Sequence, residues 1–302
     1  MTEVTSSAVS VILPVLNEEH YLANAVNAIL RQDFHGPIEV VLAIGPSKDR
    51  TMQIAHGLAA DDSRVKIVEN PTGRTAAGLN LAIANSSNPI IVRVDGHADI
   101  PNNYISIAVE LLNKTGAVNV GGVMAAEGQT PFECAVASAM RSPLGVGAAK
   151  FHTGGSAGES DTVYLGVFKR EAINAIGGFD EHFTRAQDWE LNFRLRKNGG
   201  KIYFDPRLTV TYRPRRSIMA LAKQYFEYGR WRRVVARTHK GTINLRYLAP
   251  PFTVIGTTAS VVAGFFSPIF FVPAAIYGSF LLLAAFMIGK NFKERLYLPA
   301  IL

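Results

Sequence analysis

Apolar runs of strand length alternate with helical patterns over the first third of the chain. The apolar runs occupy residues 9–15, 38–44, 65–68 and 89–94. Apolar residues recur at helical spacing after each run, over residues 18–32, 49–60, 75–85 and 101–113. This alternation is typical of an α/β fold with a doubly wound, mostly parallel sheet. Such sheets bind ligands beyond the carboxyl ends of their strands, which fall at residues 16–19, 45–49 and 95–99.

A long uncharged stretch occurs near the C-terminus. No Asp, Glu, Lys, Arg or His lies between residues 248 and 289, and a bilayer core needs about 20 apolar residues per helix. Ser267-Pro268 falls near the middle, where a tight return is expected. The pattern predicts a transmembrane helical hairpin over residues 251–267 and 269–289. A buried pair of core helices is the alternative, although helices this long normally carry charges on an exposed face.

The charge of the chain is uneven. Of 31 Lys and Arg, fifteen lie between residues 193 and 246, together with only two acids. Within this basic collar, apolar residues from Ile218 to Trp231 recur at helical spacing, which predicts an amphipathic helix at a membrane interface. Anionic lipids are the expected partner and nucleic acid is not, because the collar adjoins the predicted spans. An ordinary surface helix of a basic domain is the alternative.

Three segments follow from these patterns. Residues 1–212 form the predicted α/β domain, residues 213–246 the basic amphipathic segment, and residues 247–302 the transmembrane segment. Arg246 and Lys290 flank the uncharged stretch, so the positive-inside rule places both of its ends, and the α/β domain, on the cytoplasmic side of the inner (plasma) membrane. The single cysteine excludes an intramolecular disulfide and a cysteine-based zinc site.

A candidate metal site ends the fourth predicted strand. Asp95-Gly96-His97 places a carboxylate and an imidazole two residues apart, in a turn that glycine relaxes. Hard divalent ions accept carboxylate oxygen, and Mn²⁺ also accepts imidazole. An ion held there would neutralise a diphosphate and make it a better leaving group. An ordinary Asp-Gly turn is the alternative.

A candidate general base lies further along the chain, in Gln187-Asp188-Trp189-Glu190. An Asp beside a Trp near a cleft can remove a proton from a substrate hydroxyl. The alternative is that Asp188 is the N-cap of a helix over residues 189–198.

Six motifs in chain order resemble the inverting family 2 glycosyltransferases, which have the GT-A fold. The resemblance covers residues 10–231. The motifs occupy residues 11–18, 47–51, 73–80, 95–97, 177–181 and 187–188. Asp95-Gly96-His97 and Tyr228-Gly229-Arg230-Trp231 are most similar to the succinoglycan-biosynthesis type. These membrane-associated enzymes elongate lipid-linked sugars in polysaccharide biosynthesis of the cell envelope.

The resemblance implies a role for each matched residue. The donor would be a nucleotide-diphosphate sugar, and the cofactor Mn²⁺ or Mg²⁺. Donor binding is implied for Pro14, Asn17, Glu18, Asp49, Arg74, Asp95, Arg230 and Trp231. An acceptor-side position is implied for Gly178, Phe179, Asp180 and Trp189. Asp95 and His97 would bind the metal, and Asp188 would be the catalytic base.

The implied reaction is transfer of a hexosyl or pentosyl unit, with inversion, to a hydroxyl of a lipid-linked or cell-surface glycan. Ile44-Gly45 stands where the family commonly has Asp for nucleobase contact, and His97 replaces the second metal-binding Asp. Glu227 replaces a Gln of the processive synthases, which argues against a processive polymerase. A polyprenyl-phosphate sugar synthase and a non-catalytic nucleotide-sugar-binding membrane scaffold are the alternatives.

Overall fold

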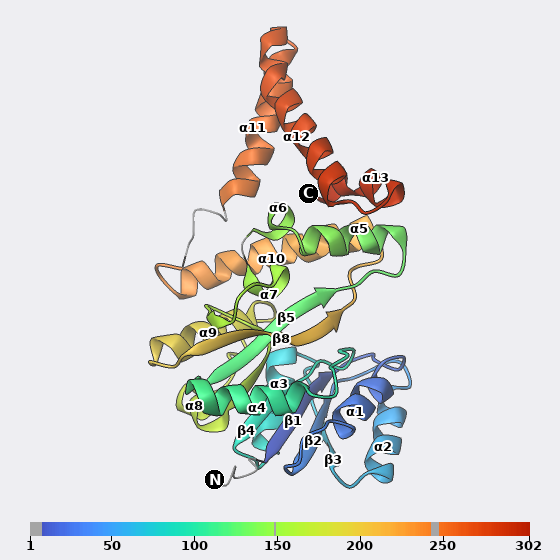
Figure 1. The fold of residues 1–302 in the computed structure, drawn as a ribbon, viewed down its shortest axis with the longest axis vertical. Coiled ribbons are helices and arrows are strands. Elements are labelled where there is room, and N and C mark those ends of the chain that lie inside the picture. The colour runs from blue at the N-terminus through green and yellow to red at the C-terminus, as the bar shows by residue number, and fades with distance from the viewer. Residues whose placement is uncertain (1–7, 148, 243–247) are drawn as a thin grey trace. The chain divides into compact units, whose positions relative to one another are not determined.

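The computed structural model describes residues 8–147, 149–242 and 248–302 (Figure 1). The chain divides into two compact units. The sheet unit comprises Met1–Ala125 and Ala149–Tyr212, and the helical unit comprises Ala126–Ala148 and Arg213–Leu302. Residues 126–148, which the sequence pattern places inside the α/β domain, therefore group with the C-terminal residues.

One eight-stranded sheet, in the order β3-β2-β1-β4-β7-β5-β8-β6, forms the centre of the sheet unit. The strands are β1 (Val9–Val15), β2 (Ile38–Ile44), β3 (Val65–Glu69), β4 (Ile90–Arg93), β5 (Asn119–Ala126), β6 (Gly158–Glu159), β7 (Tyr164–Lys169) and β8 (Ile202–Tyr212). β1 pairs in parallel with β2 and β4, and β2 with β3. β7 pairs antiparallel with both β4 and β5, and β6 pairs antiparallel with β8. The α/β class is confirmed, with a mixed sheet.

Helices cover both faces of this sheet. The helices of the sheet unit are α1 (Leu22–Leu30), α2 (Thr51–Asp61), α3 (Thr75–Ala84), α4 (Tyr104–Thr115), α7 (Lys150–Thr153), α8 (Arg170–Ala175) and α9 (Gln187–Lys197). One core cluster contains residues of α1, α2 and α4, such as Leu22, Ala55 and Tyr104. The other contains residues of α3, α8 and α9, such as Leu79 and Leu191. Apolar burial on both faces explains why the strands are nearly continuous apolar runs.

The helical unit contains the part of the collar that follows residue 212, and the uncharged stretch. Its elements are α5 (Pro131–Met140), α6 (Pro143–Val146), α10 (Ile218–Thr238), α11 (Ala249–Gly264), the 3-10 helix η2 (Pro268–Phe271), α12 (Val272–Ile288) and α13 (Phe292–Ile301). α13 packs on α5, where Leu298 is buried against Ala135 and Ala139. The buried carboxylate of Glu294 on α13 accepts a hydrogen bond from the Ser138 hydroxyl at 3.0 Å.

Two helices occupy the predicted hairpin. The hydroxyl of Ser260 on α11 donates to the Phe270 carbonyl at 2.5 Å and accepts from the Ala274 N–H at 3.1 Å. In the described part of the chain, the segment Pro268–Ile288 is the one helix long and apolar enough to cross a membrane, by length and composition. α11 has 16 residues, or about 24 Å at 1.5 Å per residue, against a hydrocarbon core of about 30 Å. A hairpin that spans twice stays a prediction, and Arg246, used for its orientation, lies outside the described residues.

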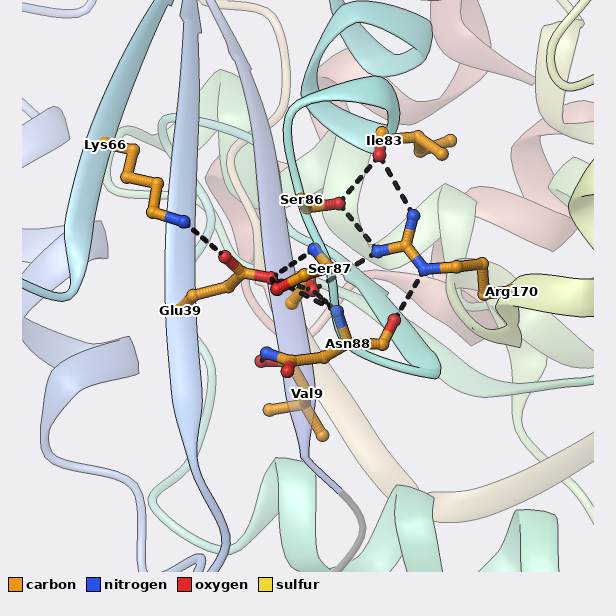
Figure 2. A network of polar contacts seen from close by, with 9 residues as sticks. Val9, Glu39, Lys66, Ile83, Ser86, Ser87, Asn88 and Arg170 are labelled. Carbon is orange, nitrogen blue, oxygen red and sulfur yellow. Dashed lines mark hydrogen bonds and ion pairs between the residues drawn. The ribbon is translucent and has the colours of Figure 1, made fainter.

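The buried carboxylate of Glu39 joins the start of β2 to the loop before β4 (Figure 2). It lies at the amino end of these strands, opposite the edge where ligands are expected. Glu39 Oε1 accepts from the Ser10 hydroxyl at 2.6 Å and from the Ser87 N–H at 2.6 Å, and Lys66 Nζ lies 2.8 Å from Oε2. Burial alone would raise the pKa of Glu39, but Lys66, Ser10 and Ser87 outweigh it and lower that pKa to about 2. This network stabilises the amino end of the sheet.

Glu39→Gln is expected to lower stability in a pH-dependent way. The folded-state pKa of about 2 lies below the ordinary value of 4.5, so the contribution is full above pH 4.5 and is lost as pH falls through 2. A shift of this size corresponds to about 3 kcal/mol at pH 7 and about half of that at pH 3. The free energy of unfolding of the sheet unit, measured at both pH values, should show the gap between the variant and the parent narrowing on acidification.

Glu159→Gln is the matched control for this prediction. The Glu159 side chain is 69% exposed and pairs with Lys201 at 3.0 Å, and exposed pairs of this kind contribute about 1 kcal/mol or less. The lowered pKa of Glu39 would be contradicted if Glu39→Gln reduced the free energy of unfolding as little as Glu159→Gln does, or by an amount that does not change with pH.

Candidate active site

The loops that follow β1 and β2 are held together by backbone and side-chain hydrogen bonds. Asn17 lies in the left-handed region with φ of 56°, which Asn adopts more readily than most residues. Its N–H donates to Ser47 Oγ at 3.0 Å, and its Oδ1 accepts from the Lys48 N–H at 2.8 Å. The two loops therefore form one continuous surface at the carboxyl edge of the sheet.

Asp49 strengthens the same connection. Its Oδ2 accepts from the Glu19 N–H at 3.2 Å, and its Oδ1 accepts from the Thr51 N–H at 3.0 Å and the Thr51 hydroxyl at 2.5 Å. The Thr51 hydroxyl is the main cause that lowers the pKa of Asp49. Both carboxylate oxygens of Asp49 thus bond within the loops, and its contact with a donor stays a prediction.

Glu18 and His97 meet at this edge. His97 Nδ1 lies 2.7 Å from Glu18 Oε1, and because an ionised carboxylate only accepts hydrogen bonds, this contact favours the tautomer with the proton on Nδ1. The Glu18 N–H donates to Thr51 Oγ1 at 2.7 Å, so the loop that carries Glu18 is itself anchored. A Cβ at Gly96 would lie 3.2 Å from Glu18 Cγ, so the approach of the two loops leaves little room for a larger residue. Carboxylates orient metal-binding histidines in this way.

Arg93, the last residue of β4, connects the two candidate carboxylates. Its side chain is only 5% exposed. Nε and Nη2 donate to Asp95 Oδ1 at 3.2 and 3.0 Å, and Nη1 donates to Asp188 Oδ1. The Asp188 side chain is 39% exposed and so remains open to a substrate. The structure therefore brings the predicted metal ligand and the predicted base together.

The residues present fit a hard divalent cation. Among the described residues no group of three or more His, Cys, Asp and Glu could enclose a metal ion. Mg²⁺ in nucleotide sites commonly has one or two protein carboxylates, with phosphate and water oxygens completing its coordination. Within the described chain, the side-chain hydrogen bonds to Asp95 reach its Oδ1, which leaves Oδ2 for an ion. Metal binding by Asp95 and His97 stays a prediction.

Asp188 does not cap a helix. α9 begins at Gln187, and the residue at its N-cap is Ala186, which has φ of 61° and provides no capping side chain. The alternative that Asp188 is an N-cap residue is therefore wrong: Asp188 lies in the first turn and bonds to Arg93. Trp189 stacks on Phe193 with ring centroids 5.5 Å apart.

The predicted acceptor-side turn is fixed by a residue of the donor-side helix. Asn80 on α3 accepts from the Phe179 N–H at 2.9 Å and donates to the Phe179 carbonyl at 2.9 Å. Gly178 has φ of 77°, and a Cβ there would lie 2.7 Å from Asn80 Oδ1. The side chain of Phe179 is buried at 2% exposure, and Asp180 Oδ1 accepts from the His182 N–H at 2.9 Å. Phe179 is thus a core residue of the turn.

The remaining predicted residues are more dispersed. Pro14 lies in β1 and is half-buried, and Arg74 is an exposed residue at the N-cap position of α3. Arg230 and Trp231 lie on α10 in the helical unit, where Arg230 pairs with Glu227 at 3.4 Å. Participation of Arg230 and Trp231 in donor binding stays a prediction.

Sequence reasoning missed Arg93 and the positioning role of Asn80. A signal for Arg93 is present in the sequence, because a charged residue inside a short apolar strand needs a buried partner. No comparable signal marks Asn80, since its partner turn lies about 100 residues further along the chain.

Comparison with known proteins shows to which of them this chain is similar. The family model for glycosyl transferase family 2 matches residues 10–177. The chain is 33% identical over 250 residues to the succinoglycan biosynthesis protein ExoA of Rhizobium meliloti (strain 1021), covering 82% of this chain and 76% of that protein.

Two further proteins are similar over most of the chain. One is a dolichyl N-acetyl-α-D-glucosaminyl phosphate 3-β-D-2,3-diacetamido-2,3-dideoxy-β-D-glucuronosyltransferase of Methanococcus voltae, with 25% identity over 80% of this chain and 77% of that protein. The other is a solved structure, the mannosyltransferase PcManGT of Pyrobaculum calidifontis in complex with GDP-Man and Mn²⁺. It has a TM-score of 0.58 and 21% identity, over 95% of this chain and 77% of that chain. At 21% identity, the likeness to PcManGT shows the fold alone.

Proposed function

Because the chain belongs to glycosyltransferase family 2, we propose that it transfers a sugar from a nucleotide-diphosphate sugar to a hydroxyl of a lipid-linked or cell-surface glycan, with inversion. The observation that carries the proposal is the pairing of Asp95 and Asp188 through Arg93 at the carboxyl edge of the sheet. A nucleotide-sugar donor is supported by the complex of PcManGT with GDP-Man. A role in polysaccharide biosynthesis is supported by the similarity to succinoglycan biosynthesis protein ExoA.

Asp188 is the proposed general base. Its carboxylate is partly exposed, and its Oδ1 is held by Arg93, so Oδ2 is the oxygen that would accept the proton of the acceptor hydroxyl. As it loses its proton to Asp188, the acceptor oxygen attacks the anomeric carbon from the face opposite the leaving nucleoside diphosphate, and the configuration inverts. A base positioned in this way contributes about 10²–10⁴-fold to the rate.

Asp95 and His97 are the proposed metal ligands. A Mn²⁺ or Mg²⁺ ion bound there would neutralise the diphosphate of the leaving nucleotide. Glu18 holds the His97 ring at 2.7 Å, and Arg93 holds Asp95 Oδ1, so both proposed ligands are oriented before a donor arrives. PcManGT in complex with Mn²⁺ supports a divalent cofactor.

The proposed acceptor is a lipid-linked saccharide at the cytoplasmic face of the membrane. The M. voltae relative, whose name gives a dolichyl phosphate-linked sugar as its acceptor, supports this choice. The apolar segment Pro268–Ile288 supports attachment to the membrane. Exposed apolar side chains on α10, among them Met219 at 77% and Phe226 at 71% exposure, support contact of this helix with the bilayer surface.

A peptide of residues 217–238 is expected to bind anionic vesicles in a salt-dependent way. Each Lys or Arg near an anionic surface contributes about 1 kcal/mol, and α10 contains five such residues. Sedimentation with phosphatidylserine vesicles should show strong binding at low salt that 1 M salt largely removes, because the screening length falls to about 3 Å. The control peptide carries Gln in place of Arg230, Arg232, Arg233 and Arg237. Equal binding of both peptides at low salt would remove anionic lipid from the proposal.

The experiment that tests the proposed function uses the full chain in detergent. We expect one nucleotide sugar from a panel to release its nucleotide only when a polyprenyl-diphosphate saccharide is present as acceptor. Transfer to polyprenyl phosphate alone would identify the chain as a polyprenyl-phosphate sugar synthase. Donor binding without transfer to either acceptor would identify the non-catalytic scaffold.

A further inference from the structure

A buried arginine separates the two proposed functional carboxylates. The Arg93 side chain is 5% exposed, whereas those of Asp95 and Asp188 are 21% and 39% exposed. Arg93 ends β4, and Asp188 begins α9, 95 residues further along the chain. Taking a guanidinium out of water is costly unless hydrogen-bonding carboxylates compensate for it. The burial of Arg93 is thus linked to the position of both carboxylates.

The guanidinium is suited to this task by its shape. It is planar and offers five N–H donors in fixed directions, so one edge can bond Asp95 while another bonds Asp188. Nε and Nη2 both donate to Asp95 Oδ1, and Nη1 donates to Asp188 Oδ1. A Lys ammonium is a compact charge at the end of a flexible chain and does not reproduce this fork.

The bonds also leave the reactive oxygens available. In the described chain, Arg93 occupies Oδ1 of each carboxylate, and Oδ2 of each is left for other contacts. The positive charge between the two carboxylates offsets their mutual repulsion, so they can lie close together. Tyr164 on β7 is close enough to Asp95 to be affected by its charge: burial raises the pKa of Tyr164 well above the ordinary value, and the charge of Asp95 adds to that effect.

We propose that Arg93 is a positioning residue for catalysis, which fixes Oδ2 of Asp188 at the spacing from the Asp95 site that attack on the donor requires. The inference rests on the proposed function of Asp188 as the base. Arg93 itself is buried and acts through Asp188. Displacement of a reacting group by about 1 Å can cost about 10²-fold in rate, so loss of the fork should affect turnover far more than folding.

A double-mutant cycle with Arg93→Gln and Asp188→Asn tests this inference in the full chain. In the parent, Arg93→Gln should lower kcat about 10²-fold. In the Asp188→Asn background the same change should lower kcat less than about threefold, because residues that act through one another are not additive. Equal losses in both backgrounds, or an unchanged kcat in Arg93→Gln, would overturn the inference.

Two further variants separate positioning from folding. Arg93→Lys keeps the charge but not the fork, and we expect kcat per folded molecule to fall, but by less than in Arg93→Gln, whatever the change in thermal midpoint. Arg170→Lys changes another partly buried arginine, which bonds the Asn88 carbonyl at 2.6 Å and the Ile83 carbonyl at 2.9 Å (Figure 2). It should lower the thermal midpoint and leave kcat per folded molecule unchanged. Parallel losses of kcat in Arg93→Lys and Arg170→Lys would show a structural role alone.

The cycle distinguishes failure of this inference from failure of the proposed function. Near-normal turnover of Asp188→Asn would remove the base, and with it any residue that acts through the base. A large loss in Asp188→Asn, together with an additive effect of Arg93→Gln, would leave the base in place and reject only the role of Arg93. Mn²⁺ binding, measured by titration of each variant with a nucleoside diphosphate present, gives a readout that does not depend on turnover.

Discussion

Asp188→Asn is expected to lower turnover about 10²–10⁴-fold, with donor affinity nearly unchanged. Asn keeps the size of the side chain, and its carbonyl oxygen can still accept the hydrogen bond that Arg93 donates to Oδ1. The amide cannot accept a proton from the acceptor hydroxyl. Because Asp188 makes no capping hydrogen bond to α9, the substitution should leave the thermal midpoint close to that of the parent.

Sugar transfer to a lipid-linked acceptor is the assay for this prediction, with donor affinity measured in parallel. Asp161→Asn is the matched control, since its side chain is 78% exposed and pairs with Arg196 at 3.1 Å. The control should retain parental turnover. If Asp188→Asn also does so, Asp188 is not the base, and the enzyme requires another proton acceptor.

The second large effect is expected from the metal site. EDTA should abolish turnover, and Mn²⁺ or Mg²⁺ should restore it. Asp95→Asn should bind the donor poorly even with excess metal, because a neutral amide is a weak ligand for a hard cation. Loss of several kcal/mol of charge stabilisation corresponds to a fall of about 10²–10³-fold in turnover.

Asparagine is preferred to alanine at residue 95 because of Arg93. Alanine would leave the buried Nε and Nη2 of Arg93 without the acceptor that lies 3.0–3.2 Å away, and buried donors without an acceptor destabilise the fold. Asn retains that acceptor. Isothermal titration of the donor with and without Mn²⁺ measures the effect directly. Full turnover in EDTA, or parental donor affinity in Asp95→Asn, would contradict the metal assignment.

Strands buried on both faces could be predicted closely from the sequence. β1 and β2 have the predicted bounds, because each is a nearly continuous apolar run in a parallel arrangement. α1 begins at Leu22, although the predicted helix begins at residue 18. The N–H groups of Glu18 and Glu19 bond to Thr51 and Asp49 in the neighbouring loop, which holds these residues outside the helix.

The second half of the sheet could not be predicted in the same way. β5 contains Gly121 and Gly122, and a Cβ at Gly122 would lie 1.8 Å from the Leu208 carbonyl oxygen of β8. Close approach of two backbones requires these glycines, yet glycine lowers strand propensity in any local pattern. β8 contains Pro206 in addition, which usually indicates an interruption. Long-range contacts, which the local pattern does not contain, therefore determine these strands.

The sequence predicts which residues belong to the candidate site but not which of them contact one another. The positions after β1, β2 and β4 follow from the rule that parallel sheets bind ligands at their carboxyl edge. That Arg93 would link Asp95 to Asp188 does not follow, because the pairing of β4 with α9 spans 95 residues and depends on the packed fold. The sequence likewise does not show that Glu18 orients His97.

The anomeric configuration of the product tests the central claim most directly. The full chain in detergent is incubated with its donor sugar and the lipid-linked acceptor, and the new glycosidic linkage is determined by NMR from its anomeric coupling constant. Direct attack by a hydroxyl deprotonated at Asp188 predicts a product with the configuration opposite to that of the donor, formed in the parent and lost in Asp188→Asn. A product that retains the donor configuration would contradict the account.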